Sequence, residues 1–174
     1  EALDDMLEVK RLAANMLGAS FEEVAALPGV TYGLTAVLSS IRFRPGSNIV
    51  VSENNFPTTV YMAYALRDAG LVKEVRIVEP DERGATRFED YEKLIDDNTV
   101  LVMVDYVGWL SGYVEDLRSL ADLAHRHGAL LVTDAFHAVG VMPVDVKRLG
   151  VDVLVTGSYK WLMSIHGAAV AYVR

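Results

Sequence analysis

Lys160 and Asp134 are the residues whose type and setting most directly suggest chemistry. Lys160 lies in the aromatic, apolar stretch Thr156-Gly-Ser-Tyr-Lys-Trp-Leu162, and apolar surroundings disfavour the ammonium form of a lysine. The neutral amine is a nucleophile that can form a Schiff base. Asp134 follows the apolar run 129–133, and His137 comes three residues later. Each residue also has an alternative interpretation without chemistry. Lys160 could be an exposed loop residue whose aliphatic stem packs on Trp161, and Asp134 could cap the following turn.

The segments around these residues predict strands that end where the polar side chains begin. Apolar, β-branched runs at 151–155 and 168–173 flank Lys160 and place it in a loop between two strand ends. Further strands are predicted at 48–52, 74–78, 99–104 and 129–133. Helices are predicted at 2–17, 34–41, 60–69, 88–95, 115–127 and, as a short connection, near 144–149. The segment 21–27 fits a short helix and a strand equally well.

Strands that alternate with helices predict a three-layer α/β/α fold with a mostly parallel central sheet. The loops after three of the strands carry Phe56, Asp105 and Asp134. Because the carboxyl ends of parallel strands meet at one edge, these residues are expected at a single site. Phe56 could offer its face to an aromatic ring there, or could pack as a hydrophobic staple of the following helix.

A glycine-containing turn, Pro28-Gly-Val-Thr-Tyr-Gly33, precedes an apolar helical run. Free backbone N–H groups and the positive end of the helix dipole make such a turn a candidate phosphate site, with the Thr31 hydroxyl as a further donor. Thr31 could equally be an ordinary helix N-cap. His125 and His127, on a predicted amphipathic helix, are expected to be surface residues.

The 174 residues, 52% of them hydrophobic and 23% charged, suit one globular domain spanning 1–174. The formal net charge of -8 argues against a nucleic-acid or anionic-membrane partner, because both require a basic face. The sequence shows no long apolar run and no signal-peptide pattern, so we expect a soluble, cytoplasmic protein. The absence of cysteine excludes disulfides and thiolate metal sites and places any cysteine nucleophile outside the chain. No set of His, Asp and Glu residues has metal-ligand spacing, so no metal is predicted.

Two motifs, Thr133-Asp-Ala-Phe-His-Ala-Val-Gly140 and Ser158-Tyr-Lys-Trp-Leu162, carry a resemblance to a known family. Over nearly its whole length, the chain resembles the large domain of fold-type I pyridoxal-phosphate enzymes of the class V aminotransferase family. This family includes kynureninases and cysteine desulfurases, and the kynureninase pattern, with Phe-Pro-Thr at 56–58, is the nearest. The resemblance implies pyridoxal 5'-phosphate as cofactor and an amino acid as substrate.

The resemblance also implies roles for the residues that match. Lys160 would form a Schiff base with the cofactor and shuttle the α-proton of the substrate. Asp134 would pair with the pyridinium nitrogen, which keeps the ring an electron sink. His137 would lie near the phenolic oxygen of the ring, and Phe56 would stack on it.

Three further residues would hold the cofactor phosphate: Val30 through its backbone, Thr31, and the hydroxyl of Tyr159. Asp105 is expected near the cofactor, where relatives carry Ser or Thr. A carboxylate there would be unfavourable unless it is protonated or close to a cation.

Other positions also depart from the pattern of the relatives. Thr59 stands where kynureninases carry Asp, and Asn54 stands where desulfurases place a His. Desulfurases also carry a His before the lysine, at the position of Tyr159. His166 falls where such loops commonly carry Pro. These changes favour neither a kynureninase nor a desulfurase.

The relatives are homodimers with a smaller C-terminal domain that supplies an arginine for the substrate carboxylate. Since the chain begins without Met and ends directly after a strand, it is expected to be a fragment without that small domain. On this interpretation the chain can bind the cofactor but turns substrate over poorly or not at all.

Two other interpretations compete with a pyridoxal-phosphate enzyme. The first is a non-catalytic descendant, a lone large domain kept as a binding or scaffold protein. The second, a dinucleotide-binding domain, fits the strand–helix alternation but lacks G-x-G-x-x-G after the first strand and leaves Lys160 unexplained.

Overall fold

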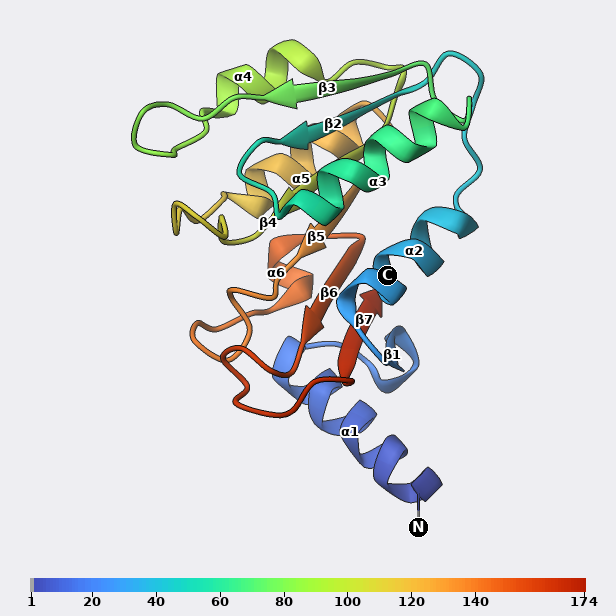
Figure 1. Ribbon diagram of the computed structural model, residues 1–174, viewed down its shortest axis with the longest axis vertical. Helices are drawn as coiled ribbons and strands as arrows, with labels where there is room; N and C mark the ends of the chain where they lie inside the picture. The colour runs from blue at the N-terminus through green and yellow to red at the C-terminus, as the bar shows by residue number, and fades with distance from the viewer. Residues whose placement is uncertain (1) are drawn as a thin grey trace.

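A seven-stranded sheet with helices on both faces forms the body of the protein (Figure 1). The computed structural model describes residues 2–174. The strand order is β1-β7-β6-β5-β4-β2-β3. The strands are β1 (Val24–Leu27), β2 (Asn48–Ser52), β3 (Glu74–Val78), β4 (Thr99–Asp105), β5 (Leu130–Asp134), β6 (Val153–Gly157) and β7 (Ala169–Val173). The predicted three-layer fold is confirmed.

The five central and outer strands from β6 to β3 are parallel, whereas β7 runs antiparallel to both β6 and β1. Gly157, the last residue of β6, is therefore paired with Ala169, the first residue of β7. Leu27, at the end of β1, is paired with Ala169 as well. The ends of β1 and β6 and the start of β7 consequently share the edge at which β4 and β5 end.

The helices form one layer on each face of the sheet. They are α1 (Ala2–Leu17), α2 (Val30–Ser40), α3 (Pro57–Asp68), α4 (Phe88–Leu94), α5 (Leu117–Arg126) and α6 (Val146–Leu149), with a 3-10 turn at Phe21–Glu23. One hydrophobic core lies between the sheet and α1, α4, α5 and α6, and contains Leu17, Tyr91 and Leu120. The second core lies under α2 and α3 and contains Leu34 and Ala63. The central strands β2, β4 and β6 are thus buried along their whole length, as in other parallel sheets.

Two helices begin earlier than predicted. α2 begins at Val30 rather than at residue 34, and α3 begins at Pro57 rather than at residue 60. A proline suits the first helical position because its missing N–H has no helical acceptor there. Segment 21–27, which fitted a helix or a strand, contains the 3-10 turn followed by β1.

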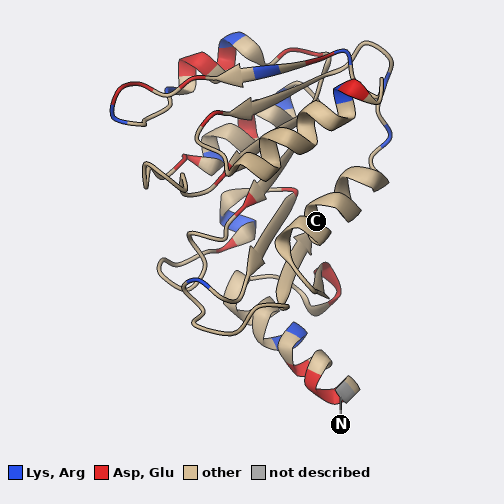
Figure 2. Ribbon diagram, in the orientation of Figure 1, with Lys and Arg blue, Asp and Glu red and all other residues tan. Residues whose placement is uncertain are grey.

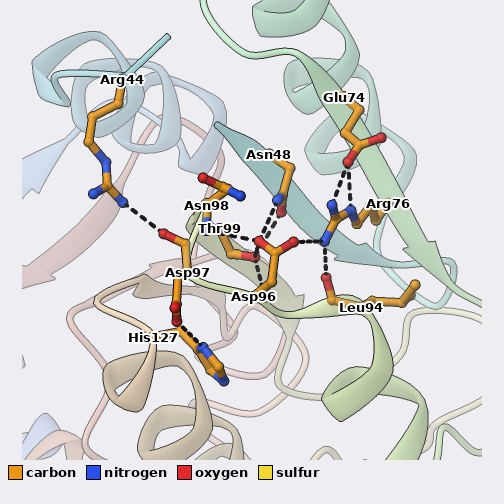
Figure 3. Close-up of polar contacts among 10 residues, drawn as sticks. All are labelled: Arg44, Asn48, Glu74, Arg76, Leu94, Asp96, Asp97, Asn98, Thr99 and His127. Carbon is orange, nitrogen blue, oxygen red and sulfur yellow. Dashed lines mark hydrogen bonds and ion pairs between the residues drawn. The ribbon is translucent and has the colours of Figure 1, made fainter. Parts of the chain in front are cut away.

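A polar network joins the amino ends of β2 and β4 (Figure 3). Asp96 accepts hydrogen bonds from the Asn48 amide and the Arg76 guanidinium at 2.9 and 2.8 Å. Arg76 also pairs with Glu74, and Thr99 Oγ1 donates to Asn48 Oδ1 at 2.8 Å. The register between β2 and β4 shifts at this point, between Asn48 and Ile49, so side chains supply contacts where the ladder is irregular.

Charged residues lie mainly on helices and loops, and most of the strand ribbons in Figure 2 are tan. Acidic and basic side chains are interspersed along α4 and at the ends of α3 and α5. Within residues 2–174, no helix is both long and apolar enough to span a membrane.

Candidate active site

A cavity of about 320 Å³ opens at the edge where β4, β5 and β6 end. The amino end of α2 and the loop from β6 to β7 close its sides. The structure brings together all eight residues that the sequence placed at the site. They are Val30, Thr31, Phe56, Asp105, Asp134, His137, Tyr159 and Lys160.

Asp134 and Asp105 are the last residues of adjacent strands and lie beside each other in the parallel register. Asp134 is 7% exposed and accepts a hydrogen bond from the Phe136 N–H at 2.8 Å. Burial raises the pKa of Asp134 to about 6, although the Phe136 N–H and the Lys160 charge act in the opposite direction. Above that pH the carboxylate of Asp134 is the form present.

Asp105 is 4% exposed, and its Oδ2 accepts the Phe56 N–H at 2.6 Å. Burial and, after it, the charge of Asp134 raise the pKa of Asp105 to about 8. Its backbone N–H donates to the Asn55 side chain, so both ends of the residue are held by the start of α3. The sequence raised protonation as one way to accommodate an acid at this position, and the surroundings of Asp105 favour it.

Lys160 extends from the β6–β7 loop over the two carboxyl groups. Its Nζ lies 2.5 Å from Nε2 of His137, and 4.1 and 5.7 Å from the ring centres of Phe136 and Phe56. Burial lowers the pKa of Lys160, while Asp134 and Asp105 act in the opposite direction. A larger fraction of the amine is therefore neutral and nucleophilic than at the surface.

His137 is neutral in this arrangement. Burial and then the charge of Lys160 lower its pKa. When Lys160 is protonated, its ammonium group can only donate in the 2.5 Å contact, so Nε2 of His137 accepts and the ring proton lies on Nδ1. The histidine thus holds Lys160 in place without adding a positive charge.

Phe136 is a cavity residue that the sequence analysis missed. Its ring packs against Tyr159, with centroids 4.8 Å apart, and lies over Gly157. A Cβ atom at position 157 would come within 2.4 Å of the Phe136 ring, so only glycine leaves room for it. Two features of the sequence pointed to Phe136: it lies between the site residues Asp134 and His137, and a glycine ends β6 at position 157.

Tyr159 stacks on His166, with ring centroids 3.9 Å apart. His166 was noted only as a departure from the proline of related loops, and its contact with a site residue was not predicted. The stack holds Tyr159 between two rings at the mouth of the cavity, although the residue is 44% exposed.

The amino end of α2 lines the cavity with residues 29–32. Gly29 is the N-cap, so Thr31 lies inside the first turn and is not the cap residue. The N–H groups of the first turn have no acceptor within a helix, and the dipole adds positive potential. A Cβ at Gly33 would come within 2.8 Å of Leu27, so glycine also allows α2 to lie close to the strands.

Phe56 is the N-cap residue of α3, one position later than a hydrophobic staple would require. Its side chain is 41% exposed and touches Trp109 edge-on, with centroids 5.7 Å apart. The ring therefore keeps a face available inside the cavity.

His125 and His127 lie at the carboxyl end of α5, shortly before β5 begins. They are therefore near the opposite edge of the sheet and do not line the cavity. His127 contacts Asp97 at 2.8 Å and fits the expected surface role. His125 is more than a surface residue, because it binds the buried Asp152 at 2.7 Å. Thr59 is buried within α3, away from the cavity lining.

Comparisons with known proteins agree on one family. A family profile described as "Aminotransferase class-V" matches residues 1–174. An uncharacterized aminotransferase, YcbU, of Bacillus subtilis (strain 168) is 35% identical over 174 residues, which cover 100% of the chain and 46% of that protein. A kynureninase of Pseudomonas fluorescens is 32% identical over 158 residues, covering 86% of the chain and 36% of the relative.

Among solved structures, the apo cysteine desulfurase from Thermococcus onnurineus NA1 superposes with a TM-score of 0.91 at 27% identity. The match covers 97% of the chain and 42% of that structure. The chain thus spans less than half the length of each of these three proteins.

Proposed function

The chain belongs to the class V aminotransferase family, and on that premise we propose that its cavity holds pyridoxal 5'-phosphate for chemistry on an amino acid. The observation that carries the proposal is the pairing of a lysine of lowered pKa with a buried carboxylate at one sheet edge. Both face a cavity of about 320 Å³, within the usual range for small-molecule sites.

The donors around the cavity fit this cofactor. It needs an anion for its ring nitrogen, an amine for its aldehyde, an aromatic face and an anion-binding cradle. Asp134, Lys160, Phe56 and the amino end of α2 supply these groups from four different elements. When bound, the protonated ring supplies an electron sink for the pair left at the substrate's α-carbon.

Lys160 would attach the cofactor through its amine, and the same amine would carry a proton to or from the α-carbon of the substrate. Both tasks need the neutral amine, and burial lowers the pKa of Lys160 in the direction that favours this form. His137 would hold the amine in position through the 2.5 Å contact.

Asp134 would hold the proton on the ring nitrogen. Its carboxylate predominates above pH 6, and the Phe136 N–H fixes one of its oxygens at 2.8 Å. A fixed anion in a buried site acts strongly on a facing cation, because little water is present to screen it.

The phosphate would bind at the amino end of α2. Backbone N–H groups of the first turn, at Val30 and beyond, would donate to it together with the hydroxyls of Thr31 and Tyr159. The stack of Tyr159 on His166 would limit the freedom of that hydroxyl.

Three reaction types would use the same residues in their first stage: transamination, kynureninase-like cleavage, and C–S bond cleavage or desulfuration. We propose an amino acid as substrate for all three. The homodimer remains a prediction from the family, to be checked by sedimentation of the protein with and without the cofactor.

The test is a visible absorption spectrum of the protein mixed with pyridoxal 5'-phosphate, before and after borohydride. We expect a new band that borohydride converts into a stable adduct. Trypsin would then fail to cut at Lys160, so the adduct would be found in the peptide 149–174. Lys160→Met should abolish the adduct, and Lys93→Arg, a change at an exposed lysine, should not.

A folded protein that forms no adduct would refute the proposal. The alternative, a non-catalytic domain kept for binding or as a scaffold, would then be favoured. An adduct elsewhere than at Lys160 would retain the cofactor but reject the assigned amine.

A further inference from the structure

The proposed function gives Asp105 no role, although it is one of the most buried polar residues of the cavity. It ends β4, and its register partner on β5 is Asp134. Adjacent strands lie about 4.8 Å apart, so the two side chains leave the sheet edge next to each other. The floor of the cavity therefore carries two neighbouring carboxyl groups.

The two oxygens of Asp105 have different surroundings. Oδ2 accepts the Phe56 N–H at 2.6 Å. Oδ1 is buried and finds no hydrogen-bond partner anywhere in residues 2–174. An ionised oxygen left in this way loses its hydration without compensation, and burial of a neutral carboxylic acid costs far less than burial of a carboxylate.

The charges that face Asp105 come from three directions. Asp134 lies beside it on β5, Lys160 reaches it from the β6–β7 loop, and Glu115 acts on it from the segment before α5. Two of these three are acids, and the lysine is shared with Asp134 and already contacts His137. One shared cation cannot offset two buried anions side by side.

We propose that Asp105 is a neutral carboxylic acid, protonated on Oδ1, and that it leaves Asp134 as the single anion of the cavity floor. Because Oδ2 accepts the Phe56 N–H, the proton belongs on the oxygen without a partner. Asp105 is then a positioning residue that lets one carboxylate act on the ring nitrogen. The action of Asp134 on the ring nitrogen rests on the proposed function, whereas the protonation of Asp105 does not.

The raised pKa of Asp105, caused by burial and by Asp134, agrees with this assignment. The geometry decides which of the two carries the proton, because Oδ1 of Asp105 is the buried carboxyl oxygen without a hydrogen-bond partner. Near neutral pH the pair then carries one negative charge in total.

Infrared difference spectroscopy of the cofactor-free protein tests the proton directly. The wild type should show the carbonyl band of a protonated carboxyl group at pH 7, which disappears as the pH rises past about 8. Asp105→Asn should lack this band, because the amide is a neutral mimic that still accepts the Phe56 N–H. Glu115→Gln, the control for the other buried acid nearby, should keep it.

No protonated-carboxyl band in the wild type at pH 7, or a band of undiminished intensity in Asp105→Asn, would overturn the proposal. If the variant does not fold, NMR of the wild type labelled with carboxyl ¹³C aspartate gives the same answer. One aspartate should titrate near pH 8, and the absence of any such aspartate would overturn the proposal.

Cofactor affinity separates the two proposals. Pyridoxal 5'-phosphate should bind Asp105→Asn within about threefold of the wild type at pH 7, because a neutral group replaces a neutral group. A loss of about tenfold or more would show that the charge of Asp105 is needed. If the wild type carries the protonated carboxyl but binds no cofactor, the proposed function fails and the state of Asp105 stands.

Discussion

Replacement of Asp105 by asparagine should change how the stability of the cofactor-free protein depends on pH. The pKa of Asp105 is about 8 in the folded protein, and an aspartate in an unfolded chain has a pKa near 3.9. Between these values the folded state holds a proton that the unfolded state has released. The free energy of unfolding of the wild type therefore falls as the pH rises through this interval.

The size of the effect follows from linkage. One extra proton in the folded state lowers the free energy of unfolding by about 1.4 kcal/mol for each pH unit. With Asp134 as the anion of the pair, Asp105 is the carboxyl group that still titrates above pH 6. From pH 6 to 7.5 the wild type should lose about 2 kcal/mol that Asp105→Asn does not lose.

Urea unfolding at half-unit steps of pH from 5.5 to 8 measures the slope for both proteins. Asp68→Asn is a matched control, because it removes one formal charge from an exposed side chain. It should follow the wild-type slope. Parallel curves for the wild type and Asp105→Asn would refute the assignment, as would a steeper fall in the variant.

Three further changes test other parts of the structure. Gly157→Ala should lower the free energy of unfolding in urea by about 1–3 kcal/mol and weaken cofactor binding, because its Cβ would displace the Phe136 ring. Unchanged stability and affinity would show that the ring can move freely. Asp134→Asn should lower turnover of the cofactor-loaded protein far more than cofactor affinity, and equal losses in the two assays would contradict its role at the ring nitrogen. Asp96→Asn should cost about 0.5–1 kcal/mol at pH 7, since its pair with Arg76 is partly exposed. Because its pKa is lowered to about 2, this stabilisation should be lost as the pH falls below about 4 toward 2, the reverse of Asp105.

Buried strands were the most predictable part of the fold. Segment 48–52 was predicted with its observed bounds, because a strand covered on both faces contains a short apolar run. Segment 74–78 was also predicted with its observed bounds, although β3 is an edge strand and only its last residue is buried. β1 could not be distinguished from a helix, because four residues at the edge of the sheet become a strand only through pairing with the distant β7. α2 and α3 begin early because Gly29 is the N-cap of one helix and Pro57 the first residue of the other, positions that glycine and proline favour.

The gathering of the eight site residues was predictable because parallel strands end at a common edge. The contacts among them were not, because they depend on side-chain packing between distant segments. The ring of Phe136 over Gly157 and the stack of Tyr159 on His166 are of this kind. The difference between the two oxygens of Asp105 also depends on a contact across 49 residues of sequence, which local patterns do not reveal.

Because β7 runs antiparallel to β6, the loop between them, which holds Lys160, can vary in length. A parallel connection needs a crossover long enough to return to the opposite edge, usually through a helix. The loop 158–168 instead begins and ends at the same edge, and among its described residues it contains no helix. Residues can be inserted or removed there without moving any strand, at a modest cost in loop entropy. The position of the Lys160 amine can therefore be adjusted independently of the sheet that holds Asp134.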